Sequence, residues 1–269
     1  MRLDEVRGFV FDVDGTLVHR AGPEVRVIPG AREVLERIRA SGRPYALFTN
    51  GSHVAPEVLA SELRGVGLPV GDEQLLTPLR SVLTYLQRFR REARVLPFLT
   101  DAARCYLEAQ GVRLVDGRHD VHTDAVFVAQ PSQVDFDELE RAARAVIAGA
   151  RLLTGSYVPA YAGADGPVFS RGAMLTAALA KATGARPLVV GKPSHAAVRE
   201  MRTRLGVPSQ ETAVIGDDVS LDVALGHLGS SLTVLVRTGI SGEVDLSRVP
   251  EKRRPHHAVE SIGKLLEWL

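Results

Sequence analysis

Asp12 and Asp14 are the residues of this chain whose type and spacing most directly suggest chemistry. They follow the apolar run Phe9-Val10-Phe11 and precede Gly15-Thr16-Leu17. Two carboxylates beside a hydrophobic strand are costly to ionise together unless a cation or a shared proton relieves their repulsion. A divalent metal is the simplest relief. Because the glycine indicates a turn, one carboxylate is expected to hold a metal and attack, while the other points at the substrate. The alternative interpretation is a strand end whose aspartates cap the following loop.

A second polar group, Thr49-Asn50-Gly51-Ser52, follows the apolar segment 45–48. A hydroxyl followed by the backbone amides of Asn50 and Gly51, with a helix from about Pro56 behind them, would make a cradle for an anion. Taken alone, Asn50-Gly51 could equally be a simple turn and Ser52 a helix cap. The aspartate pair upstream favours the cradle.

Lys192 is one of four lysines among 33 basic residues, the others being Lys181, Lys252 and Lys264. It lies in Gly191-Lys192-Pro193-Ser194, between the apolar run 188–190 and a predicted helix over 195–205. In a chain that otherwise uses arginine, this lysine suggests a site that needs a compact point charge.

Further carboxylates, Asp217 and Asp218, follow a predicted strand over 212–215, and Asp222 lies four residues later. A carboxylate cluster that faces another carboxylate pair favours a hard cation with oxygen ligands, which points to Mg²⁺. Whether Asp218 or Asp222 assists the metal stays open, since Asp222 could equally serve as a charge at a helix N-terminus.

These residues can meet only if a parallel sheet brings their strand ends together. The pattern strand, helix 31–40, strand 45–48 has short connections and predicts a right-handed βαβ unit. Thr49 should then emerge at the same sheet edge as Asp12, where open α/β sheets bind ligands. The predicted fold is α/β: a doubly wound, Rossmann-like parallel sheet core with an inserted smaller α/β cap domain.

The inserted domain is indicated by a second α/β pattern, and we expect core segments at 1–80 and 171–269 around a cap at 81–170. Its predicted strands are 95–99, 112–115, 125–129 and 151–154, its helices are 101–110 and 136–148, and 155–172 is the return crossing. His119 and His122 have too few companions for a metal site and are predicted to be a loop pair.

The amino-acid composition limits the kinds of partner that this protein is expected to bind. The chain has 269 residues, 33 basic and 32 acidic, so its net charge of +1 provides no global field for nucleic acid or an anionic membrane. No apolar run approaches the ~18 residues that a membrane span needs. The single Cys105 cannot form an internal disulfide, which fits a reducing compartment. We therefore expect a cytoplasmic protein without nucleic-acid or membrane partners.

The four groups together resemble the ordered motifs of the haloacid dehalogenase-like hydrolases. The motifs are Asp12-Val13-Asp14-Gly15-Thr16-Leu17, Leu47-Phe48-Thr49-Asn50, Gly191-Lys192-Pro193-Ser194 and Ile215-Gly216-Asp217-Asp218. The insertion between the second and third motifs looks like the large cap of the second type (class IIA). The residues of these motifs are most similar to those of the phospholysine phosphohistidine inorganic pyrophosphate phosphatase-like and p-nitrophenyl phosphatase-like members.

The resemblance implies roles for these residues. Asp12 would be the nucleophile and Asp14 the general acid/base, with Thr49, Asn50, Gly51 and Lys192 binding the phosphate. Magnesium would be held by Asp12, the backbone carbonyl of Asp14 and Asp217. The resemblance also suggests a homodimer through the cap.

The predicted function is a magnesium-dependent phosphatase that hydrolyses a small phosphate monoester, a phosphorylated metabolite, through an aspartyl-phosphate intermediate. Receiver-like signalling modules and phosphomutases use a similar Asp/Thr/Lys constellation and are the alternatives. Asp14 favours turnover over storage, because it is an acid placed to activate water. The ester is not identified by the sequence; loops near His122, Tyr157 and Tyr161 are the candidate contacts.

Overall fold

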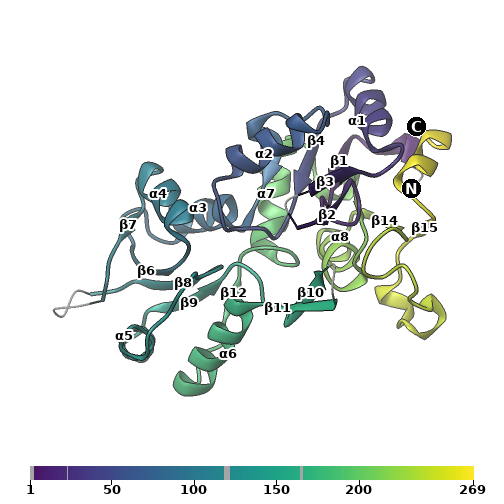
Figure 1. The fold of residues 1–269 in the computed structure, drawn as a ribbon. Helices are drawn as coiled ribbons and strands as arrows, with labels where there is room; N and C mark the ends of the chain where they lie inside the picture. Colours follow the sequence, from purple (N-terminus) through teal and green to yellow (C-terminus); the bar gives the residue numbers. More distant parts are fainter. Residues whose placement is uncertain (1–2, 23, 118–121, 164–165) are drawn as a thin grey trace.

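Two parallel sheets, each covered by helices, organise the chain (Figure 1). The structure is a computed structural model and describes residues 3–22, 24–117, 122–163 and 166–269. Within those ranges, no helix is both long and apolar enough to cross a membrane.

The first sheet forms the core domain, with the strand order β15-β14-β13-β1-β4-β5 and parallel neighbours throughout. Its strands are β1 (Gly8–Phe11), β4 (Tyr45–Phe48), β5 (Leu75–Leu76), β13 (Thr212–Gly216), β14 (Leu232–Val236) and β15 (His257–Val259). The core helices are α1 (Ala31–Ala40), α2 (Pro56–Gly65), α7 (His195–Leu205) and α8 (Ala224–Gly229). A small hairpin, β2 (Val18–Ala21) with β3 (Glu24–Val27), follows the Asp12–Asp14 turn.

Strand β1 shows why helices must cover both faces of this sheet. Phe9 and Phe11 pack into one apolar cluster with Leu35 of α1. Val10 packs into another cluster with Met201 of α7. Because successive side chains of a strand point to opposite faces, a strand buried along its whole length needs a layer on each side. The doubly wound core predicted from the sequence is confirmed.

The second sheet forms the cap, with the order β12-β9-β8-β6-β7 and parallel neighbours. Its strands are β6 (Arg94–Phe98), β7 (Arg113–Leu114), β8 (Ala125–Val128), β9 (Arg151–Thr154) and β12 (Leu188–Val189). The helices of this part are α3 (Pro78–Phe89), α4 (Asp101–Ala109), α5 (Phe136–Ile147) and α6 (Arg171–Thr183). A two-stranded hairpin, β10 (Ala160–Gly163) with β11 (Gly166–Phe169), leads from β9 towards α6. Figure 1 shows this lobe, in teal and green, beside the core.

The end of the cap differs from the predicted boundary at residue 170. Leu179 of α6 packs with Val126 and Val146 in a cap cluster, and β12 pairs with β9. The chain therefore returns to the core only after Val189. The run 188–190 falls within the predicted core segment 171–269, because a short apolar segment does not reveal which of two parallel sheets it joins. The start agrees more closely, since α3 begins at Pro78 and buries Leu79 against the cap.

Helix α6 begins so close to the end of β8 that no side chain fits at Gly172. A methyl group there would overlap the carbonyl oxygen of Ala129. We expect Gly172→Ala to lower the free energy of unfolding by about 1–3 kcal/mol, as overpacking does. The matched control is Gly65→Ala at the exposed end of α2, where a methyl group meets nothing within 4 Å. This control should gain roughly 0.5–1 kcal/mol. Urea unfolding measures both, and wild-type stability in Gly172→Ala would contradict the close contact.

Candidate active site

The site forms where three core strands end side by side. Asp12 follows directly after β1, Thr49 after β4 and Asp217 after β13. Strand β1 lies between β4 and β13 and pairs with both in parallel. Their side chains therefore emerge at one edge of the sheet, as the βαβ pattern predicted. Lys192 follows β12, a strand of the cap sheet, although residue 192 lies in the segment 171–269 that was predicted to belong to the core.

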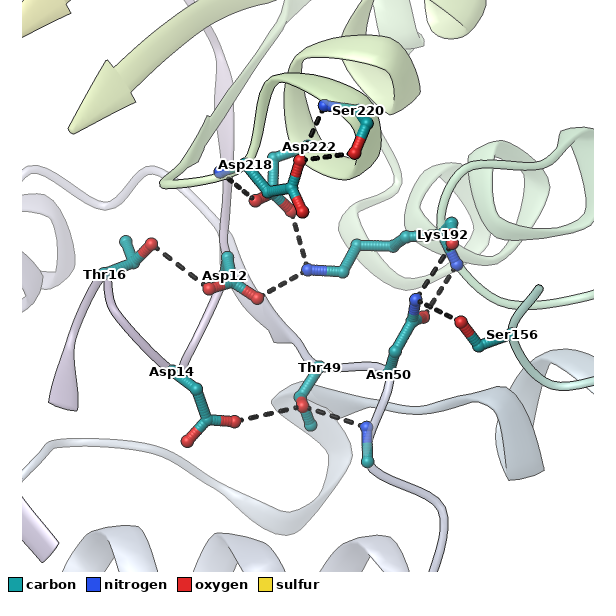
Figure 2. Close-up of polar contacts among 11 residues, drawn as sticks. Asp12, Asp14, Thr16, Thr49, Asn50, Ser156, Lys192, Asp218, Ser220 and Asp222 are labelled. Atoms are coloured by element: carbon teal, nitrogen blue, oxygen red, sulfur yellow. Dashed lines mark hydrogen bonds and ion pairs between the residues drawn. The ribbon is translucent and has the colours of Figure 1, made fainter. Parts of the chain in front are cut away.

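Asp12 is held from both sides (Figure 2). Its side chain lies between Thr16 and the ammonium of Lys192, with only 8% of the residue exposed. Oδ2 accepts a hydrogen bond from the Thr16 hydroxyl at 3.2 Å, and Oδ1 accepts one from Lys192 Nζ at 2.6 Å. The backbone amide donates to the carbonyl of Ile215 at 2.8 Å, which extends the β1–β13 ladder. The carboxylate therefore has a fixed direction.

Lys192 is the buried cation of the site. Its Nζ donates to Asp12 Oδ1 at 2.6 Å and to Asp222 Oδ1 at 2.7 Å, and only 2% of the residue is exposed. Burial by itself lowers the pKa of a lysine, but the two adjacent carboxylates outweigh it and raise the pKa of Lys192 above its ordinary value. The ammonium is therefore charged and positioned.

Three carboxylates meet around this ammonium. Asp12, Asp217 and Asp222 are all buried, and one oxygen from each lies within 4.8 Å of the others. Burial raises the pKa of both Asp217 and Asp222, and the nearby carboxylate of Asp12 raises both further. One lysine cannot balance three ionised carboxylates. A hard, oxygen-only donor set of this kind is one that could hold Mg²⁺.

Two glycines and a backbone amide determine the position of the Asp217 carboxylate. The backbone amide of Ile240 donates to Asp217 Oδ2 at 2.7 Å. Gly15 has φ = +84°, and a methyl group there would lie 2.5 Å from the same oxygen. At Gly239 a methyl group would overlap it outright. The glycine after Asp14 is thus needed both for the left-handed turn and for the close approach of Asp217.

Asp218 and Asp222, between which the sequence leaves the choice open, have different hydrogen-bond partners (Figure 2). Asp218 Oδ1 accepts from the amide and the hydroxyl of Ser220, both at 2.6 Å, and caps the π-helical turn Val219–Val223. Asp222 Oδ2 accepts from the Asp218 amide at 3.1 Å, while its Oδ1 faces Lys192. Asp222 therefore joins the carboxylate cluster, and Asp218 shapes the loop.

Asp14 lies apart from the cluster and is nearly half exposed, at 49% of its side chain. Its Oδ1 accepts from Arg20 Nε at 2.6 Å, and its Oδ2 lies 3.5 Å from the Thr49 hydroxyl. Desolvation and the charge of Asp12 raise the pKa of Asp14, and Arg20 opposes them. The second guanidinium contact of Arg20, 2.7 Å long, is to Glu62. An acid at the open side of the site, with a raised pKa, is suited to exchange protons. The role of its backbone carbonyl towards a metal stays a prediction.

The expected anion cradle has a different internal arrangement. The Gly51 amide donates to the Thr49 hydroxyl at 3.0 Å. The Asn50 side chain makes a pair of bonds with the backbone of Lys192: Oδ1 accepts from its amide at 2.8 Å, and Nδ2 donates to its carbonyl at 2.9 Å. Nδ2 also lies 3.4 Å from the hydroxyl of Ser156 in the cap. Asn50 therefore fixes the lysine loop, a role that the sequence did not reveal.

The three cap residues named as candidate contacts have different outcomes. His122 Nε2 lies 3.0 Å from Asp124 Oδ1, just before β8 begins, so it sits at the amino end of a cap strand and away from the core. That candidate was wrong, because spacing along a loop does not show which end of the sheet it borders. Tyr157 follows β9 and is 43% exposed. The side chain of Tyr161, like His119, lies outside the described residues.

Arg20 and Glu62 were not found from the sequence. Arg20 lies in the β2–β3 hairpin and Glu62 on α2, so they are 42 positions apart in an arginine-rich chain. No spacing rule marks such a pair. The only indication of Arg20 in the sequence is that its segment follows shortly after Asp14.

Two family models and several known proteins match this chain. Residues 9–113 match the model of the haloacid dehalogenase-like hydrolases, and residues 189–265 match a second model, described as HAD-hydrolase-like. Mouse chronophin (Mus musculus) is 30% identical, covering 99% of this chain and 94% of that protein. Dihydroxyacetone phosphatase of Corynebacterium glutamicum is 28% identical, covering 96% of this chain and 90% of that protein.

A solved structure shows the same arrangement of core and cap. The crystal structure of 4-nitrophenylphosphatase from Thermotoga maritima superposes with a TM-score of 0.88 at 25% identity, over 98% of both chains. The identity to chronophin extends over nearly the whole of both proteins, and the matched segments contain every residue of the carboxylate cluster. The chain therefore belongs to the haloacid dehalogenase-like hydrolases, in the branch with a large α/β cap.

Proposed function

We propose that this protein is a magnesium-dependent phosphatase that hydrolyses a small phosphate monoester through an aspartyl-phosphate on Asp12. The observation that supports it most strongly is the placement of Lys192 Nζ, which lies 2.6 Å from Asp12 and 2.7 Å from Asp222 beside a third carboxylate. A nucleophilic carboxylate must be kept ionised next to an anionic phosphoryl group. A buried ammonium and a cation-binding cluster provide this.

The first half-reaction uses Asp12 as the nucleophile. A carboxylate oxygen attacks phosphorus, the bond to the leaving alcohol breaks, and an acyl phosphate forms on Asp12. Lys192 lowers the repulsion between the carboxylate and the phosphoryl oxygens as they approach. When bound, Mg²⁺ would be held by Asp12, Asp217 and Asp222 and would neutralise charge on the phosphoryl oxygens. Thr49 and the amides after β4 would accommodate the remaining oxygens.

Asp14 completes both half-reactions. Protonated, it can give its proton to the leaving alkoxide, which makes the alcohol. Ionised, it can take a proton from the water that attacks the acyl phosphate, which releases inorganic phosphate and restores Asp12. Its exposure and its distance from the buried cluster suit such a role, because it must reach substrate and water alternately.

The same acid argues against a signalling module that stores an aspartyl-phosphate. Storage requires that water near the acyl phosphate is not activated, whereas Asp14 lies 3.5 Å from Thr49, at the edge of the site. The names of relatives also support hydrolysis, since they include a dihydroxyacetone phosphatase, a ribonucleotide monophosphatase and a sugar-phosphatase. The predicted cytoplasmic location and homodimer through the cap remain part of this proposal.

The test is phosphate release from p-nitrophenyl phosphate and a panel of alkyl monoesters, with Mg²⁺ and with EDTA. We expect release that requires the metal, and trapping of a labelled acyl phosphate on Asp12 by rapid quench. Failure to release phosphate from every ester, or full activity in EDTA, would refute the proposal.

The close contacts of Lys192 with two carboxylates predict that no other basic residue can replace it. An arginine keeps the charge but is bulkier and directs its donors differently, so it should not fit between two carboxylates each within 2.7 Å of Nζ. We expect Lys192→Arg to fold and to lose on the order of 10² in turnover, about 2.7 kcal/mol of barrier. Lys181→Arg, on the exposed side of α6, is the control and should be unaffected. Wild-type steady-state rates in Lys192→Arg would refute the assigned role.

A further inference from the structure

The loop that carries Lys192 begins as an extension of the cap sheet. Strand β12 pairs with β9, and the hydrogen bonding continues past the end of β12. The amide of Val190 donates to the carbonyl of Thr154 at 2.9 Å, and the amide of Gly191 donates to the carbonyl of Gly155 at 3.1 Å. A methyl group at Gly191 would overlap the Gly155 carbonyl oxygen, so the two segments approach as closely as backbone allows. Up to Gly191, the cap therefore sets the position of this loop.

At Lys192 the hydrogen-bond partner changes from the cap to the core. The Lys192 amide donates to Asn50 Oδ1 at 2.8 Å, and the Lys192 carbonyl accepts from Asn50 Nδ2 at 2.9 Å. Asn50 follows Thr49 after core strand β4. The same Nδ2 lies 3.4 Å from the hydroxyl of Ser156, which belongs to the cap (Figure 2). One side chain of the core thus contacts both the lysine backbone and the cap.

An amide side chain is needed to make both bonds to the lysine backbone. The Lys192 amide can only donate and its carbonyl can only accept, so the partner must offer an acceptor and a donor side by side. A carboxylate of the same shape offers two acceptors, and one of them would face the Lys192 carbonyl. Asn50 is the only asparagine in the chain. The single asparagine therefore stands where a donor and an acceptor are both required.

The cap side of this contact is anchored in the interior of the cap. The Thr154 hydroxyl donates to the Ser156 carbonyl at 2.8 Å, and the Thr176 hydroxyl of α6 donates to the Thr154 hydroxyl at 3.0 Å. Both threonines are fully buried. Because the turn that contains Ser156 is bonded to α6, it moves together with the cap. A displacement of the cap therefore changes the contacts of Asn50 and the position of the lysine backbone.

The Lys192 side chain leaves little room for such a displacement. Its Nζ contacts Asp12 at 2.6 Å and Asp222 at 2.7 Å, and only 2% of the residue is exposed. A shift of about 1 Å in a group that acts on the reacting atoms can cost on the order of 10² in rate. The backbone position of Lys192 is therefore important for catalysis, although the backbone itself does not touch the reacting atoms.

We propose that Asn50 is a positioning residue for the reaction: it places the Lys192 ammonium by holding the lysine backbone, and its contact with Ser156 makes that placement depend on the cap. This role rests on the proposed phosphatase activity, because Asn50 acts through a lysine whose function is to help Asp12 attack. The position of the cap then affects the chemical step.

The first test compares Asn50→Asp and Asn50→Ala with the wild-type chain, using Mg²⁺ and p-nitrophenyl phosphate. The aspartate keeps the shape but loses the donor, and the alanine loses both bonds without adding a charge. We expect kcat to fall by a factor of about 10–10² in both variants. KM should change by less than about threefold, because Lys192 acts mainly as the carboxylate and the phosphoryl group approach.

Gln110→Glu is the matched control, since it makes the same amide-to-carboxylate change at the exposed end of α4 and should leave kcat unchanged. Thermal unfolding shows whether each variant is folded. Wild-type kcat in either Asn50 variant, or an equal loss in the control, would overturn the positioning role.

A double-mutant cycle tests whether Asn50 acts through Lys192. In a Lys192→Arg protein the fitted ammonium is already lost, so adding Asn50→Ala should lower kcat by less than about twofold. The same factor of loss in both backgrounds would mean that Asn50 acts independently of the lysine, and the proposal would fail.

Ser156→Ala tests the dependence on the cap. Loss of this long hydrogen bond should lower kcat by about threefold, with no further loss when Asn50 is already alanine. Ser61→Ala, exposed on α2, is the control and should be unaffected. Unchanged kcat in Ser156→Ala, or an additive loss in the double variant, would overturn the link to the cap. No phosphate release by the wild-type chain would refute the phosphatase and this role together, whereas normal kcat in the Asn50 variants would refute the role alone.

Discussion

An Asp12→Asn protein is expected to fold normally and to release no phosphate above background. The asparagine amide is a poor nucleophile and a weak ligand for a hard cation, so both the attack on phosphorus and the carboxylate cluster fail together. Folding should survive, because the substitution removes one of three crowded carboxylates and leaves Lys192 paired with Asp222 at 2.7 Å. Thermal unfolding and phosphate release from p-nitrophenyl phosphate measure the two effects separately.

The control for this prediction is Asp218→Asn, which changes an aspartate in the neighbouring loop that lies outside the cluster. An asparagine at 218 can still accept hydrogen bonds from Ser220 through its side-chain oxygen, so most of the turnover should remain. Substantial phosphate release by a well-folded Asp12→Asn protein would remove the nucleophile from the mechanism. Complete loss in Asp218→Asn would show that the loop, and not the carboxylate at 12, limits activity.

The second large effect is expected at Asp14. Asp14→Asn should slow hydrolysis of an alkyl phosphate by roughly 10²–10⁴, the range for a lost general acid or base. For p-nitrophenyl phosphate the loss should be smaller, because the nitrophenolate leaves without needing a proton. The two substrates, measured side by side on the same protein, report the proton transfer directly.

Two features of the structure sharpen this comparison. The asparagine oxygen can still accept from Arg20 Nε, so the β2–β3 hairpin should keep its position. Glu62→Gln weakens the other ion pair of Arg20 without touching Asp14, and it should cost little on either substrate. Equal losses on both esters in Asp14→Asn would mean that Asp14 is structural. A large loss in Glu62→Gln would mean that the position of Arg20 controls the site.

Most of the fold and the identity of the central residues could be read from the sequence, because they depend on local patterns. Helices over 31–40 and 195–205 and strands over 45–48 and 151–154 were predicted with the observed bounds. The helices have apolar residues at helical spacing, and the strands are short runs of mostly buried residues. Asp12, Thr49 and Asp217 follow directly after buried parallel strands, and parallel strands must end at one edge. The sequence therefore implies that these three residues approach one another.

Tertiary structure alone decided the contacts between segments far apart in the chain. The strand at 188–189 joined the cap because pairing with β9 was available there, and nothing local distinguishes one parallel partner from another. His122 fell at the amino end of a cap strand for the same reason. Asp222 entered the cluster, and Asp218 did not, because of which backbone amide and hydroxyl each side chain reached. The bonds of Asn50 to Lys192 and of Arg20 to Asp14 and Glu62 span up to 142 positions. Such contacts depend on side-chain direction after packing, and residue type and spacing do not encode that direction.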